Sequence, residues 1–144
     1  MPEGQVSLQS EIVELRHLLD EARARLARQA IEHQVSRLVM NAATVEQALT
    51  GVVCAICEGL QVDFCAVWLP SEDGSNIRCH AHACAGDLRE LAPFTDATLA
   101  ARFPPGVGLP GRVWQSGQPH WLEVLDADHN FPRAGAAAAA RGKL

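Results

Sequence analysis

The residues best suited to chemistry lie in one short segment, which reads Cys-His-Ala-His-Ala-Cys from Cys79 to Cys84. Alternate residues of a β-strand share a face, so His80, His82 and Cys84 are predicted to line one side of a strand. Cys79 is expected on the other side. Two imidazoles and a thiolate form a ligand set that suits a transition metal, although a fourth ligand would have to come from elsewhere. The other face carries two alanines that suit a core, so we interpret the histidine face as exposed to solvent rather than as a metal site.

A second pair of thiols, Cys54 and Cys57, has the C-x-x-C spacing of redox motifs. Such motifs open a helix, where the helix dipole lowers the thiol pKa. This pair lies inside a predicted helix between apolar residues, so we predict buried structural thiols. The sequence contains no G-x-S-x-G, no P-loop and no paired carboxylates at one apparent site, and Ser116 and His120 are separated by Gly117, which is expected to end a helix. We therefore predict that the chain is not an enzyme.

A glycine-rich pattern lies within Phe103–Trp121, where Gly106–Gly111 matches the G-x-G-x-x-G dinucleotide fingerprint. That fingerprint must follow a buried strand and open a long helix. Here two prolines precede it, and the helix is expected to end at Gly117. We therefore predict a glycine turn, a helix of about two turns from Pro110 and a return strand over 118–124.

Composition and charge disfavour several classes of function. The net charge is −5 and no lysine or arginine cluster is present, which disfavours binding to nucleic acids or anionic membranes. No apolar run reaches the roughly 18 residues of a membrane span, and the first residues do not resemble a signal peptide. Five cysteines without a secretion signal indicate reduced thiols, so a cytoplasmic location is predicted.

The N-terminal segment is predicted to be a helix over about residues 8–40. Its apolar residues have the a/d spacing of a coiled coil, which predicts a homodimer through residues 8–40. A helix lying on its own domain is the alternative. Further along, the apolar phase changes, and Ile31, Val35 and Leu38 are expected to join the core of the following domain. The residues with coiled-coil spacing are Ile12, Leu15, Leu19, Ala22 and Leu26.

Capping and turn signals predict the other elements. Thr44 and Gln47 form a capping box for a second helix, which is expected to end near Leu60 with the help of Gly59. The Asp-Gly pair that begins at Asp73 predicts a hairpin. The remaining predictions are strands over 64–69 and 76–85, at least one helical turn within 86–101 and a helix over 133–143.

Several large apolar side chains near the glycine turn could form a pocket for a small planar ligand. Core packing is the alternative for each of them. Arg112 and Arg133 are expected either to pair with Asp126 or Asp128 and hold the loop, or to bind an anion. The candidate pocket residues are Trp68, Trp114, Trp121, Phe131 and Arg112.

Two motifs together resemble the GAF domains of bacterial multidomain signalling proteins. The first is the Phe103–Trp121 pattern, and the second is Asp128-x-Asn-Phe-Pro-Arg-Ala134. The resemblance extends over about residues 31–140 and implies an α+β fold, a PAS-like antiparallel sheet with packed helices. It divides the chain into a signalling helix, residues 1–30, and a GAF-like domain, residues 31–144. That domain is expected to be incomplete, because the last two central strands of the family are missing.

The resemblance implies a non-catalytic sensory or regulatory module. Such a module binds a small ligand or partner and relays the signal through a dimerising helix to a downstream signalling domain or protein. Two alternatives stay open: the N-terminal fragment of a sensor histidine kinase or diguanylate cyclase, as in two-component systems, and a ligand-free dimerisation module. The cofactor is unknown, because neither the Cys-His pair of bilin-binding GAF domains nor the cyclic-nucleotide signature is reproduced in its expected place.

Overall fold

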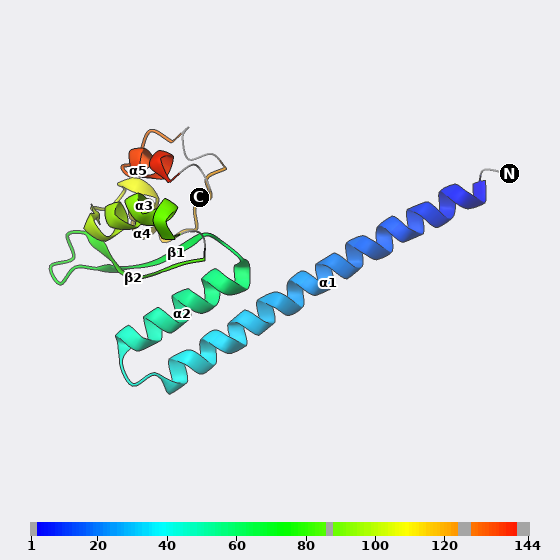
Figure 1. Cartoon of the computed structure of the whole chain (residues 1–144), viewed down its shortest axis with the longest axis horizontal. Coiled ribbons are helices and arrows are strands. Elements are labelled where there is room, and N and C mark those ends of the chain that lie inside the picture. Colours follow the sequence, from blue (N-terminus) through cyan, green and yellow to red (C-terminus); the bar gives the residue numbers. More distant parts are fainter. Residues whose placement is uncertain (1–2, 86–87, 124–127, 141–144) are drawn as a thin grey trace.

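The computed structural model describes residues 3–85, 88–123 and 128–140 of the 144-residue chain. One long helix, α1 (Glu3–Asn41), extends from a small domain in which helices pack on a three-stranded antiparallel sheet (Figure 1). The predicted α+β fold with a long N-terminal helix is confirmed. The predicted domain boundary between residues 30 and 31 lies inside α1, which runs unbroken through it, and the division stays a prediction. None of the described helices combines the length and apolarity needed to cross a membrane.

The second helix, α2 (Val45–Leu60), runs back along the C-terminal part of α1 (Figure 1). The predicted capping box begins this helix. Thr44 Oγ1 accepts a hydrogen bond from the backbone N–H of Gln47 (3.1 Å), and Gln47 Oε1 accepts one from the N–H of Ala43 (2.9 Å). These bonds satisfy donors that the first turn of a helix leaves free, which explains why the start of α2 is readable in the sequence.

Gly59 has a different role from the predicted one. It lies inside α2, and the residue that closes the helix is Gln61, in a left-handed conformation with φ 53°. A Cβ atom at residue 59 would lie 2.5 Å from Cγ1 of Ile31. Gly59 therefore allows α2 to pack closely on α1, and the prediction that it helps to end the helix is wrong.

The two halves of α1 differ in burial. Ile31, Val35 and Leu38 are half-buried, and Leu38 Cδ2 lies 3.2 Å from where a Cβ of Gly51 in α2 would be. The predicted change of apolar phase therefore marks the point where α1 joins the domain. In the N-terminal half, the large apolar residues are between 47% and 66% exposed; they include Leu8, Ile12, Leu15, Leu19 and Leu26.

The sheet has the strand order β1-β2-β3, with antiparallel pairing throughout. The predicted hairpin joins the first two strands. Asp73 Oδ1 closes its turn by accepting hydrogen bonds from Ser71 Oγ (2.6 Å) and from the backbone N–H of Ser75 (3.0 Å). The strands are β1 (Phe64–Pro70), β2 (Ile77–Cys84) and β3 (Arg102–Phe103).

The predicted return strand over 118–124 is wrong for the residues that are described. Residues 118–123 form no strand, and residue 124 lies outside the described part. Pro119 has no backbone N–H to donate to a sheet, and Trp121 is 88% exposed and adds nothing to the core. The third strand is instead β3, which directly precedes the glycine turn.

An irregularity in β2 decides which of its side chains share a face. The pairing with β1 skips His80, because Ala81 and Cys79 lie opposite consecutive residues of β1. Such a bulge shifts the alternation of faces by one residue. Cys79 therefore joins the face of His82 and Cys84, and the prediction that His80 shares their face is wrong.

Helices cover both faces of the sheet (Figure 1). On the α2 side, Cys57 Sγ donates a hydrogen bond to the carbonyl of Ala83 (3.6 Å). On the other side, the ring of Phe94 packs edge-on against Phe64, with 5.1 Å between centroids. The histidine-bearing face was expected to meet solvent, but it lies under the helices α3 (Leu88–Ala100), α4 (Gly108–Ser116) and α5 (Ala134–Ala139).

The apolar core on this side joins α3 to the C-terminal segment. α3 agrees with the prediction of at least one helical turn within 86–101 and extends over 13 residues. α5 is shorter than the helix predicted over 133–143, of which residues 141–143 lie outside the described part. The buried cluster consists of Leu91, Phe94, Phe131, Ala137 and Ala140.

Candidate functional site

The glycine turn is built by close backbone contacts. Gly106 and Gly108 have φ angles of 81° and 65°, which side-chain-bearing residues rarely adopt. The N–H of Gly106 donates to the carbonyl of Gly111 (2.8 Å), and a Cβ at Gly111 would lie 2.5 Å from the carbonyl oxygen of Pro104. The three glycines therefore serve the turn, and α4 begins within it and ends at the left-handed cap Gly117, as predicted.

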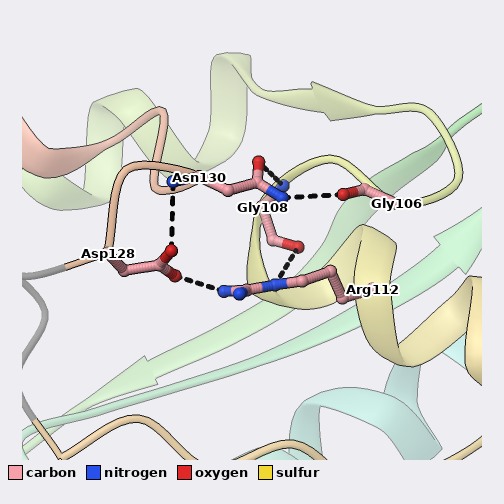
Figure 2. Close-up of polar contacts among 5 residues, drawn as sticks. All are labelled: Gly106, Gly108, Arg112, Asp128 and Asn130. Carbon is pink, nitrogen blue, oxygen red and sulfur yellow. Dashed lines mark hydrogen bonds and ion pairs between the residues drawn. The ribbon is translucent and has the colours of Figure 1, made fainter.

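Three side chains hold a distant segment against this turn (Figure 2). Asn130 Oδ1 accepts a hydrogen bond from the N–H of Gly108 (2.9 Å), and Asn130 Nδ2 donates to the carbonyl of Gly106 (2.8 Å). Arg112 forms an ion pair with Asp128 and also donates from Nε to the carbonyl of Gly108 (3.3 Å). We name this set, Arg112, Asp128 and Asn130 with the two glycines, the loop clamp.

Asp128 is the acidic member of the loop clamp. Its Oδ1 accepts a hydrogen bond from the backbone N–H of Asn130 (3.0 Å). That bond, together with the Arg112 guanidinium, holds the pKa of Asp128 below its ordinary value. The predicted pairing of Arg112 with Asp128 is confirmed, whereas Asp126, the other predicted partner, lies outside the described residues.

The loop clamp positions Arg133, which follows it by three residues. Arg133 Nη1 donates a hydrogen bond of 2.6 Å to Thr98 Oγ1 in α3. Its guanidinium carbon lies over four aromatic rings, with distances to the ring centroids between 4.6 and 5.6 Å. Burial lowers the pKa of Arg133 to about 10, so the group still carries its charge at neutral pH. The rings belong to Trp68, Phe94, Phe103 and Phe131.

A cavity of about 530 Å³ lies between the sheet and α4. β1 supplies alternate residues to its floor, including Phe64, Ala66 and Trp68, and α4 supplies Trp114. Among the described residues that line the cavity, Arg133 alone carries a charge. A mostly apolar hollow with one polar anchor has the character of a small-molecule site.

The structure separates the five predicted pocket residues. Trp68 and Trp114 line the cavity, as expected. Phe131 is 7% exposed and belongs to the core, Trp121 points into solvent, and Arg112 belongs to the loop clamp. Arg133, which was expected to pair with an aspartate or to bind an anion, was not among the predicted pocket residues, although a single cation between apolar residues in Asn-Phe-Pro-Arg-Ala was a usable signal.

The metal and thiol candidates are not brought together into a site. Within the described residues, no group of three or more His, Cys, Asp or Glu could hold a metal ion. His82 stacks on Phe64 with 6.1 Å between centroids, Cys84 lies 3.8 Å from Thr95 Oγ1, and His80 is exposed.

The second thiol of the C-x-x-C pair is buried in the core, as predicted. Cys57 is 1% exposed and donates a hydrogen bond to the carbonyl of Val62 (3.1 Å). Burial raises the pKa of Cys57, so the thiol stays protonated and is a poor nucleophile. Cys54 is half-buried.

Ser116 and His120 do meet, although Gly117 was expected to keep them apart. Ser116 Oγ lies 3.1 Å from His120 Nε2. The same hydroxyl accepts a hydrogen bond from the N–H of Gln118 (3.1 Å), and both side chains are exposed. The contact therefore belongs to the turn that follows α4.

Comparison with known proteins agrees with this architecture. The crystal structure of the GAF domain from Acinetobacter phosphoenolpyruvate-protein phosphotransferase is similar, with a TM-score of 0.58 and 15% sequence identity. The match covers 74% of this chain and 61% of that one, and it shows a shared fold. No curated protein matches the sequence. The family model of the GAF domain matches residues 44–141, from the cap of α2 onward, and the chain therefore belongs to the GAF family, whose members generally serve as regulatory, sensory modules.

Proposed function

We propose that this chain senses a small molecule, which binds in the cavity between the sheet and α4, and relays its presence through α1 to a second copy. The observation that carries the proposal is the cavity itself. Its floor and wall are mostly apolar and aromatic, and Trp68 and Trp114 line it from β1 and α4. Sites of this size and lining suit small organic ligands.

The path from the cavity to α1 crosses the sheet. The cavity lies on one face of β1, and α2 packs on the other face. α2 in turn contacts α1 closely at Gly59 and Ile31. A ligand that moves the sheet can therefore shift the helix pair, provided that it binds the two helix arrangements with different affinity.

The proposed output is pairing of α1 with α1 of a second copy. The residues with a/d spacing, such as Ile12 and Leu19, are exposed, and pairing would bury them. We expect Leu19→Lys to shift the mass measured by light scattering from dimer to monomer. Val13→Lys, on the outer side of the predicted seam, is the matched control and should leave the dimer intact. A monomeric wild-type chain would contradict this part of the proposal.

Two other contexts are distinguished by experiment. The first alternative is the N-terminal fragment of a sensor histidine kinase or diguanylate cyclase, which a reading frame that continues into a catalytic domain would reveal. A ligand-free dimerisation module is the second alternative, and it predicts that no small molecule raises the unfolding temperature. A ligand that is specific for the folded state must raise it.

The cavity is tested by filling it. Ala66 lies on the cavity floor, so Ala66→Phe should abolish the thermal stabilisation that a small molecule gives to the wild-type chain. Ala100→Phe, on the exposed surface of α3, is the control and should keep it. Stabilisation that survives Ala66→Phe would show that the ligand binds elsewhere.

A further inference from the structure

The charge of Arg133 has few partners. Of the described residues, Thr98 alone accepts a hydrogen bond from this guanidinium, and none of their carboxylates forms an ion pair with it. Arg133 Nε is buried without a hydrogen-bond partner in the described part of the chain. The side chain nevertheless lines the cavity. A cation therefore lies at the wall of a mostly apolar cavity, and the described residues accept one hydrogen bond from it.

The four rings around Arg133 explain only part of this arrangement. Aromatic faces attract a cation through their quadrupole. A guanidinium also carries five N–H donors that lie in its own plane, and rings above and below the plane do not satisfy them. A buried donor without a partner lowers stability. An oxygen anion placed in that plane would satisfy donors that the rings cannot.

The cavity restricts which anion would fit. Of the described residues that line it, Arg133 is the charged one, and most of the others are aliphatic or aromatic. One guanidinium balances one negative charge, and its fork matches the two oxygens of a carboxylate. A phosphate group with two charges would need further donors that the described lining does not offer.

We propose that the cavity binds a small monocarboxylate with an apolar body, and that Arg133 is the anchor for its carboxylate. This inference rests on the proposed sensory function and names the ligand class of the same site. The apolar body lies against Trp68, Leu109 and Trp114, and the carboxylate lies against the guanidinium.

The test uses octanoate and its neutral counterpart octanamide, which differ little in shape. Titration calorimetry with the whole chain at pH 7 should show that octanoate binds at least about tenfold more tightly, since a charge-assisted bond is roughly twice as strong as a neutral one. Arg133→Met should reduce this preference to less than about twofold. The octanamide affinity should change little, because the apolar wall remains.

Arg78→Met removes the same charge from an exposed site on β2 and should preserve the preference. Arg133→Lys keeps the charge without the planar fork and should retain a reduced preference, which covers the case in which Arg133→Met fails to fold. Equal binding of the two probes to the wild-type chain would overturn the carboxylate assignment and leave the sensory function standing. If neither probe binds, the monocarboxylate assignment is overturned, and the sensory function is decided by the thermal stabilisation test.

Asp126 needs a separate control, because it was expected to pair with Arg112 or Arg133 and lies outside the described residues. Asp126→Asn should leave the preference for octanoate unchanged. If the preference appears only in this variant, the guanidinium is already occupied by a carboxylate of the chain, and the proposal is wrong.

Discussion

The two faces of the sheet differ in the size of their side chains and in how closely those side chains pack. One face lies under α2, and the other lies under α3 and α4. On the α2 side, Ala81 is 8% exposed and Cys57 is 1% exposed, so these small residues are closely packed. On the other side, Phe64 and Trp68 are large, and a cavity of about 530 Å³ remains among them. Large rings held apart around a cation leave more room than small residues in close contact.

The same substitution should destabilise one face of the sheet strongly and leave the other nearly unaffected, and this pair gives the largest expected effect. Ala81→Leu should lower the free energy of unfolding by about 2 to 3 kcal/mol, because extra methylene groups overfill a packed site. Ala66→Leu should change it by less than about 0.5 kcal/mol, because the side chain enters the cavity. Urea unfolding followed by circular dichroism measures both. Equal losses would mean that the two faces are packed alike.

The loop clamp maintains the open face by fixing the segment that carries Arg133. Asn130→Ala removes two hydrogen bonds and leaves the N–H of Gly108 and the carbonyl of Gly106 without partners. We expect a loss of about 2 kcal/mol in the free energy of unfolding. Asn41→Ala at the exposed end of α1 loses one exposed bond and should cost far less. If both variants unfold alike, the clamp does not support the cavity face.

The closely packed side can also be tested at the contact between α1 and α2. Gly59→Ala should lower the free energy of unfolding by about 1 kcal/mol, because the new Cβ meets Ile31 and outweighs the gain in helix propensity. Gly135→Ala in α5 has open space around it and should raise the free energy of unfolding by about 0.5 kcal/mol. Stabilisation by both substitutions would show that α1 and α2 are loosely packed.

Several predictions that rest on local sequence patterns are confirmed, whereas features that depend on contacts between distant segments were not predicted. The capping box at Thr44, the turn at Asp73 and the cap at Gly117 act within a few residues, and each is confirmed. The bulge at His80 depends on the register with β1, so the alternation of residues in β2 alone could not reveal it. The place of Arg133 depends on the docking of residues 128–133 onto the glycine turn, which two separate motifs do not specify.

The smallest expected effect is the pH dependence of the loop clamp. The folded-state pKa of Asp128 is lowered, so its contribution to stability is present above its unfolded pKa of about 4 and is lost as pH falls through the folded value. Asp128→Asn should therefore be less stable than the wild-type chain at pH 7 and should lose less between about pH 5 and pH 3. Asp73, whose pKa is lowered to about 2 by its hydrogen bonds from Ser71 and Ser75, titrates in both chains and cancels in the difference. Parallel acid curves for the two chains would show that Asp128 contributes as a hydrogen-bond acceptor rather than as a charge.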